Sequence, residues 1–225
     1  MTEKMRGVPV GRRQPPHTVR VSCFAMKTLK HLMIGAALLA ASLPTLSAKA
    51  VVGQPAPDFT VTDIDGRDHT LSKLKGKTVV LEWVNPECPF VARHYGTGNM
   101  PSLQKEASGD GVVWITINSG AKGEQGDYAP EKVKAWLKKH GAAPTAYVRD
   151  HDGKVGKLYQ AKTTPHMFVI NPEGVLIYDG AIDSSPRGDK NAEPYVKAAL
   201  AAAKEGKLPA KTTSQPYGCG VKYDS

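Results

Sequence analysis

The sequence predicts an α/β domain in which helices flank a central mixed sheet, and three observations support this fold class. Two apolar, β-branched runs at 78–84 and 112–117 have the length of buried strands, and each precedes a helical pattern. Two further apolar runs predict a hairpin over 167–178, with Asn171-Pro172-Glu173-Gly174 as its turn. An Ala-rich segment at 193–207 is then predicted to close the domain as a helix.

Turn and capping signals place the other elements. Asp65-Gly66 lies between two alternating runs and predicts an N-terminal β-hairpin within residues 51–74. Residues 130–141 begin with Pro, carry basic residues in the last turn and end in Gly, which predicts a helix. The other predicted elements are helices at 89–95, 101–107 and 154–159 and a strand at 145–148.

Cys88 lies where the strand 78–84 gives way to a helix that Pro89 begins. The unpaired N–H groups and the dipole of a helix N-terminus stabilise a thiolate, and redox cysteines need a low thiol pKa. We therefore predict that Cys88 is a redox-active nucleophile, and the junction favours an exposed thiol. The alternative is a buried structural cysteine, because free cysteines are among the most buried residues.

The chain from about Val52 to its C-terminus resembles the thioredoxin-like superfamily in its peroxiredoxin-like branch, the redoxin or alkyl hydroperoxide reductase/thiol-specific antioxidant proteins. The resemblance implies a thioredoxin-like fold with oxidoreductase and antioxidant activity. One departure is that position 91 is Val, where thioredoxins have the second cysteine of Cys-x-x-Cys. The motifs that carry it are Pro57-Asp58-Phe59, Asn85-Pro86-Glu87-Cys88-Pro89-Phe90-Val91, Thr163-Thr164-Pro165-His166 and Gly218-Cys219-Gly220.

The resemblance also implies a substrate-contacting surface around the nucleophile. Pro165 matches the proline that is cis in this superfamily and faces the active-site cysteine, although most X-Pro bonds are trans. We assign substrate contact to four residues on this basis. They are Pro89, Phe90, Thr164 and Pro165.

Glu82 precedes Cys88 by six residues and matches the buried acid that shuttles protons for the thiols of thioredoxins. Strand alternation places Glu82 on one face with Val80 and Val84. A buried carboxylate costs several kcal/mol unless it has partners, so its pKa would be shifted. The alternative is a strand-end glutamate with access to water. His94 and His166 are either neighbours of Cys88 or ordinary polar side chains.

The formal charge of +9 arises mainly in the first 50 residues. This segment holds eight of the 30 Lys and Arg residues and one of the 21 acidic residues. The rest of the chain carries 22 basic and 20 acidic residues and is nearly neutral. Composition therefore gives no electrostatic case for nucleic-acid binding.

Residues 26–50 have the pattern of a secretory signal, with a basic start at Met26, an apolar core at 32–43 and the small-x-small site Ala48-Lys49-Ala50. The core is too short for a transmembrane helix, and an uncleaved membrane anchor is the alternative. We expect Met26 to be the true start and the exported, periplasmic chain to begin near Val51, without stable membrane insertion. The expected divisions are a leader and signal at 1–50, a thioredoxin-like domain at 51–208 and a C-terminal tail at 209–225.

Only two cysteines remain in the expected mature chain, Cys88 and Cys219, which are 131 positions apart. An even pair in an oxidising compartment indicates a disulfide or a redox couple. The first hypothesis is thiol-disulfide exchange, in which Cys88 attacks and Cys219 resolves the intermediate. The partners are then protein or small-molecule thiols and disulfides, or peroxides, and no cofactor or metal is expected.

Three alternatives stay open. A thiol peroxidase of the peroxiredoxin type would have Pro-x-x-x-Thr-x-x-Cys, but this chain has Leu81 and Asn85 at those positions. A thioredoxin-fold copper chaperone would use thiolate and imidazole ligands, but such proteins have two closely spaced cysteines. The third is a non-catalytic domain. The sequence leaves open the substrate, the electron donor, the oligomeric state and whether Cys219 contacts Cys88.

Overall fold

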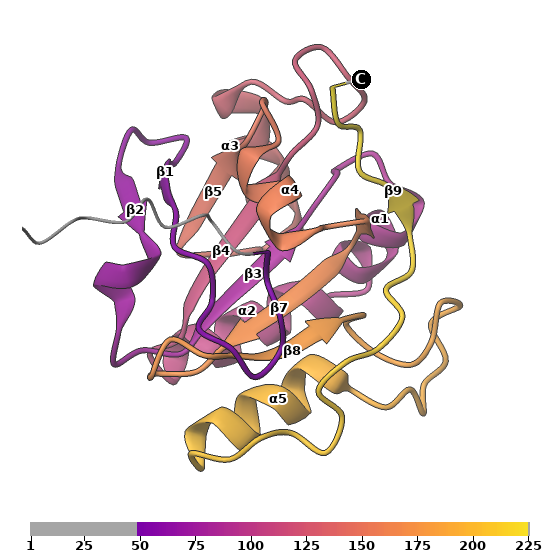
Figure 1. Cartoon of the computed structure of the whole chain (residues 1–225). Helices are drawn as coiled ribbons and strands as arrows, with labels where there is room; N and C mark the ends of the chain where they lie inside the picture. The colour runs from indigo at the N-terminus through magenta and orange to yellow at the C-terminus, as the bar shows by residue number, and fades with distance from the viewer. Residues whose placement is uncertain (1–48, 225) are drawn as a thin grey trace, which may run out of the picture. The chain divides into compact units, whose positions relative to one another are not determined.

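The computed structural model describes residues 49–224, and its centre is a five-stranded sheet in the order β5-β4-β3-β7-β8 (Figure 1). β3, β4 and β5 run parallel, whereas β7 is antiparallel to β3 and β8 is antiparallel to β7. The predicted mixed sheet is therefore confirmed. Its strands are β3 (Val79–Trp83), β4 (Val113–Asn118), β5 (Ala146–Arg149), β7 (His166–Ile170) and β8 (Leu176–Gly180).

The helices follow the predicted order with small differences at their ends. α2 begins at Asn99 rather than near residue 101, because Gly98 caps it in the left-handed conformation with a φ of 78°. The predicted N-terminal hairpin is present as β1 (Thr60–Thr62) and β2 (Asp68–Thr70), followed by the 3-10 helix η1 (Leu71–Leu74). The α-helices within residues 49–224 are α1 (Pro89–Gly96), α2 (Asn99–Gly109), α3 (Pro130–His140), α4 (Lys154–Tyr159) and α5 (Tyr195–Lys204).

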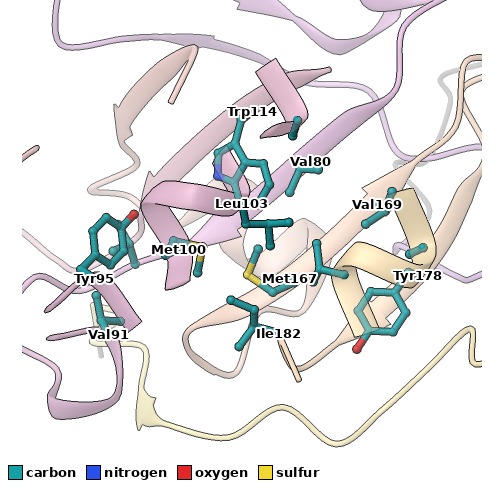
Figure 2. Close-up of a cluster of buried hydrophobic side chains, with 14 of the residues drawn as sticks. Val80, Val91, Tyr95, Met100, Leu103, Trp114, Met167, Val169, Tyr178 and Ile182 are labelled. Carbon is teal, nitrogen blue, oxygen red and sulfur yellow. The ribbon is translucent and has the colours of Figure 1, made fainter. Parts of the chain in front are cut away.

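The sheet is buried on both faces, and each face has its own apolar cluster. On one face Val80 and Trp114 pack with side chains of α1, α2 and α5, as Figure 2 shows for Tyr95, Met100 and Leu103. The opposite face packs against α4 and the N-terminal segment and contains Leu81 and Trp83. The predicted alternation of β3 is confirmed, and it directs Glu82 to the face covered by α1 and α2.

The tail beyond α5 returns to the domain and forms one strand of a two-stranded pair that the sequence did not predict. β9 (Cys219–Gly220) pairs antiparallel with β6 (Thr163–Thr164), next to the start of β7. Two-residue strands are too short to produce a detectable periodicity. Figure 1 shows this part of the tail beside α1. The pairing brings the second cysteine of residues 49–224 to the end of the sheet where α1 begins.

The predicted signal segment and the start at Met26 lie outside the described residues. Ala50 is buried, and its backbone N–H donates to the carbonyl of Leu158 at 3.2 Å. The chain start near Val51 stays a prediction. Within residues 49–224, each helix is too short or too polar to span a membrane.

Candidate active site

Cys88 caps the N-terminus of α1 at the end of a short turn that follows β3. Its φ and ψ are −72° and 127°, so it has extended backbone, and Pro89 begins the helix. The turn is held by Asn85, whose carbonyl accepts the N–H of Cys88 at 3.0 Å and whose side chain accepts the N–H of Glu87 at 2.9 Å. The predicted strand-to-helix junction is therefore confirmed, and Cys88 lies at the positive end of a helix dipole.

The expectation that Cys88 is exposed is wrong, because the side chain is 0% exposed. Its Sγ donates a hydrogen bond to the carbonyl oxygen of Thr164 at 3.0 Å. The Thr164–Pro165 peptide bond is cis, as the resemblance implied. The residues next to Cys88 predicted the strand-to-helix junction but not the burial of the thiol. The tail and the segment of β6 cover it.

Cys219 lies directly across from Thr164 in the β6–β9 pairing. The tail comes close to Thr164 because the residue before Cys219 is glycine. A β-carbon at Gly218 would lie 2.0 Å from the carbonyl oxygen of Thr164. Both Cys88 and Cys219 are free thiols, and they lie close enough for each to shift the pKa of the other. The structure therefore brings together two cysteines whose contact the sequence left open.

The two thiols differ in proton affinity. Burial raises the pKa of Cys88, but hydrogen bonds from the Cys219 thiol and the Val91 N–H outweigh burial, so the net pKa is below the ordinary thiol value. Burial and the neighbouring Cys88 raise the pKa of Cys219 to about 11. Of the two thiols, Cys88 is therefore the one that loses its proton more readily.

Glu82 is also fully buried, so the alternative of a water-accessible glutamate is wrong. Burial raises the pKa of its carboxyl, and its four hydrogen-bond donors act in the opposite direction. The donors come from α1, α2 and β4, and among the described residues none of the hydrogen bonds of Glu82 goes to Cys88. They are Tyr95 Oη at 2.7 Å, Trp114 Nε1 at 2.7 Å, Gln104 Nε2 at 2.9 Å and Thr116 Oγ1 at 3.1 Å.

The two histidines make hydrogen bonds to groups other than Cys88. His166 Nε2 pairs with Asp179 Oδ1 at 2.7 Å. His94 is 2% exposed, and its Nε2 lies 3.0 Å from the hydroxyl of Tyr217, two residues before Cys219. Sequence reasoning missed Tyr217. The available signal was a large aromatic residue beside the tail cysteine in a segment otherwise rich in Gly and Pro.

The four residues assigned to substrate contact surround the buried thiol. Pro89 is exposed, whereas Thr164 is 2% exposed. The ring of Phe90 packs against that of Tyr217, with centroids 5.9 Å apart. On the other side, the N–H of Ala121 binds the carbonyl of Lys222 at 2.7 Å, so the loop after β4 also holds the tail. A small cavity of about 10 Å³ lies between this loop, the turn before Cys88 and the tail.

Residues 49–224 contain no group of three or more His, Cys, Asp or Glu side chains arranged to hold a metal ion. The site contains two neighbouring thiols, of which Cys88 has a lowered pKa and Cys219 a raised one. Such a pair can exchange with an external disulfide and then close on itself.

Comparisons with known proteins place this site in context. A family model described as the AhpC/TSA family matches residues 52–179. The thiol-disulfide oxidoreductase ResA of Bacillus subtilis is 30% identical over 132 residues, which span 56% of this chain and 64% of that protein. The thiol:disulfide interchange protein DsbE of Escherichia coli K12 is 28% identical over 149 residues, or 64% of this chain and 72% of that protein. The crystal structure of a hypothetical protein from Sinorhizobium meliloti 1021 superposes with a TM-score of 0.69 at 26% identity, covering 80% of this chain and 98% of that one.

Proposed function

This chain belongs to the AhpC/TSA family, and on that premise we propose that it is an exported thiol-disulfide oxidoreductase in which Cys88 attacks and Cys219 resolves. The observation that carries the proposal is that the two cysteines meet at Thr164, whose carbonyl accepts the thiol hydrogen of Cys88 and which pairs with Cys219 across β6 and β9. The similarity to proteins named thiol-disulfide oxidoreductase and thiol:disulfide interchange protein supports the same reaction class.

In the first step, the thiolate of Cys88 attacks one sulfur of a substrate disulfide. A Cys88–substrate disulfide forms, the substrate S–S bond breaks, and the second substrate sulfur leaves as a thiolate that takes a proton from solvent. The lowered pKa of Cys88 serves this step, because the thiolate is the attacking species.

In the second step, Cys219 gives its proton to solvent, and its thiolate attacks Sγ of Cys88 as the Cys88–substrate S–S bond breaks. A Cys88–Cys219 disulfide forms, and the remaining substrate sulfur leaves as a thiolate. The substrate disulfide is reduced to two thiols, while the protein dithiol gives up two electrons and becomes a disulfide. An external dithiol is then required to return the protein to the reduced form.

The neighbouring residues have defined parts in this scheme. The carbonyl of Thr164 and the turn at Pro165 hold the Cys88 thiol until the substrate arrives. Pro89 and Phe90 are the proposed substrate contacts on α1. Because Cys88 is 0% exposed, the tail must move away from it before a protein disulfide can reach the sulfur.

Glu82 remains the proposed proton shuttle, with one added requirement. None of its four hydrogen bonds reaches Cys88, so a proton moving between them needs an intermediate donor such as a water molecule. The same four bonds also give Glu82 an anchoring role between α1, α2 and β4.

Thiol peroxidase activity is the second candidate, because the family includes peroxiredoxin-like proteins. The two positions expected to orient a peroxide are occupied by residues with other contacts. Leu81 lies in the cluster on the opposite face of the sheet, and the side chain of Asn85 binds the Glu87 N–H. These contacts favour disulfide exchange over reduction of peroxides.

The replacement Cys219→Ser tests the proposal directly. With a disulfide-bonded protein as substrate, this variant should accumulate a mixed disulfide on Cys88, detected by non-reducing electrophoresis and mass spectrometry, and turnover should stop. The replacement Cys88→Ser is the control and should form no adduct. Normal turnover of Cys219→Ser would show that Cys219 does not resolve the intermediate.

A further inference from the structure

Tyr217 ties the tail to the domain at two points, two residues before Cys219. Its hydroxyl lies 3.0 Å from His94 Nε2 and donates to Asp183 Oδ1 at 2.5 Å. His94 and Asp183 are both buried, at 2% and 8% exposure. A hydroxyl held between two buried polar groups fixes the position of the chain that carries it more firmly than a surface contact does.

The Tyr217 hydroxyl bridges His94 and Asp183. The Asn99 amide donates to His94 Nδ1 at 2.9 Å, and on the other side of the ring Nε2 lies 3.0 Å from the oxygen of Tyr217. The phenolic hydrogen of Tyr217 goes to Asp183. Burial and the Asp183 carboxylate raise the pKa of Tyr217, so the hydroxyl stays neutral and can both accept and donate.

The charged groups that face His94 agree with a neutral imidazole. Burial lowers the pKa of His94, and the guanidinium of Arg93 acts in the same direction. Arg93 Nη2 lies 3.3 Å from His94 Nε2, and it also donates to the carbonyl of Ser185 at 3.3 Å. The Asp183 carboxylate opposes this effect on His94. Burial and Arg93 therefore keep the imidazole of His94 neutral beside Tyr217.

His94 and Cys88 belong to the same helix, which is why this tie bears on the chemistry. Cys88 caps α1 and His94 lies on its last turn, so the two keep a fixed separation. Tyr217 contacts His94, and Cys219 lies beside Cys88 at Thr164. Only Gly218 separates the two tail residues, and two residues span at most about 7 Å. Fixing Tyr217 on α1 therefore limits where the sulfur of Cys219 can be.

We propose that Tyr217 is a positioning residue that holds Cys219 against Cys88 through its hydroxyl contacts with His94 and Asp183. This proposal rests on the proposed function, because it concerns the delivery of the resolving thiol. Tyr217 does not touch the reacting atoms, and its effect is on how often Cys219 lies within bonding distance. Correct placement of a reacting group can change a rate by orders of magnitude.

The replacement Tyr217→Phe isolates the hydroxyl, because the ring that packs on Phe90 is kept. The matched control is Tyr195→Phe, since the hydroxyl of Tyr195 accepts only an exposed Lys211 ammonium, at 3.1 Å, among the described residues. The measurement is the equilibrium of each variant with mixtures of reduced and oxidised glutathione. It gives the effective concentration of Cys219 at Cys88, together with the amount of Cys88–glutathione disulfide.

We expect Tyr217→Phe to lower this effective concentration by about tenfold or more, because a hydrogen bond to a charged group is lost. Cys88–glutathione disulfide should accumulate, and the pKa of Cys88 should move toward the ordinary value as the Cys219 donor is lost. Tyr195→Phe should match the wild type. Asp183→Asn keeps an acceptor for the Tyr217 hydroxyl, so its effective concentration should stay near the wild-type value. Asp183→Ala removes the acceptor and should lower the effective concentration. If Tyr217→Phe does not fold, the comparison of Asp183→Asn with Asp183→Ala tests the positioning role of Tyr217 instead.

A Tyr217→Phe protein with the wild-type effective concentration and Cys88 pKa would overturn this proposal. The variant Cys219→Ser distinguishes a failure of the positioning role of Tyr217 from a failure of the two-cysteine mechanism. If Cys219→Ser traps adducts while Tyr217→Phe behaves as the wild type, the two-cysteine mechanism stands and the positioning role is wrong. If Cys219→Ser turns over normally, the proposed function itself fails.

Discussion

Gly218 packs directly against the carbonyl oxygen of Thr164, and a β-carbon at position 218 would be 2.0 Å from that oxygen. The same oxygen accepts the thiol hydrogen of Cys88 at 3.0 Å. Gly218 has a φ of 142°, a backbone conformation that residues other than glycine rarely adopt. The approach of the tail to the nucleophile therefore depends on the absence of one side chain.

The replacement Gly218→Ala should lift the tail from Cys88. Overpacking typically costs about 1–3 kcal/mol, so tail opening should become about tenfold more frequent or more. We expect faster alkylation of Cys88 and slower formation of the Cys88–Cys219 disulfide. Gly220→Ala is the control, because the nearest atom to a β-carbon there is the Lys162 oxygen at 4.0 Å. Equal alkylation rates in both variants would contradict this account of the closed tail.

The low pKa of Cys88 should depend on the thiol of Cys219. In the wild type, the Cys88 thiolate should form below the ordinary thiol range, while Cys219 stays protonated until about pH 11. Replacing Cys219 with Ala removes a donor to the thiolate and should raise the pKa of Cys88, whereas Ser keeps a donor and should raise it less. Thiolate absorbance in the ultraviolet, followed against pH, measures both shifts. An unchanged pKa in the Ala variant would remove Cys219 as the cause.

The replacement Glu82→Gln separates proton transfer from anchoring. If Glu82 shuttles protons, the variant should slow thiol-disulfide exchange by about 10²–10⁴-fold, with a smaller effect on folding. A normal exchange rate with a lower unfolding temperature would instead assign Glu82 to anchoring alone.

The buried carboxyl of Glu82 also predicts a pH dependence of stability. Its pKa in the folded state is raised above the unfolded value, so its contribution is fully present below the unfolded pKa. That contribution is lost as the pH rises through the raised folded pKa. Glu82→Gln should lose this dependence, which denaturant unfolding at several pH values would show. Parallel pH curves for the two proteins would contradict the raised pKa.

The parts of the fold that could be predicted are those with local signals. β3 was predicted from its apolar, β-branched run, and Pro89 marked the start of α1, so the place of Cys88 at the junction followed from adjacent residues. The cis bond before Pro165 followed from the resemblance rather than from a local pattern, since most X-Pro bonds are trans.

The rest of the site depends on contacts between distant segments. Cys219 reaches Cys88 only because β9 pairs with β6, and two-residue strands carry no periodicity. The burial of Cys88 has the same origin. The partners of Tyr217 come from α1 and from the segment after β8, and no spacing in the sequence relates them. The sequence could therefore place Cys88 at the junction and name Cys219 as the candidate resolving thiol, but it could not predict the cover over Cys88 or the pairing that brings Cys219 beside it.

The N-terminus of the exported protein should lie near Val51. This rests on the basic, apolar and Ala48-Lys49-Ala50 segments of the sequence. N-terminal sequencing of the protein purified from its native cell would locate the cleavage site. A chain that retained residues 26–50 would contradict release from the membrane.

The central claim is that Cys88 and Cys219 form a redox pair, and disulfide mapping of the oxidised protein tests it most directly. The protein is oxidised with a mild disulfide reagent, its free thiols are blocked and counted, and its proteolytic peptides are identified by mass spectrometry. The account predicts no free thiol at these two positions and one peptide pair joined by a Cys88–Cys219 disulfide. Two free thiols, or a Cys88 adduct that persists beside a free Cys219, would contradict it.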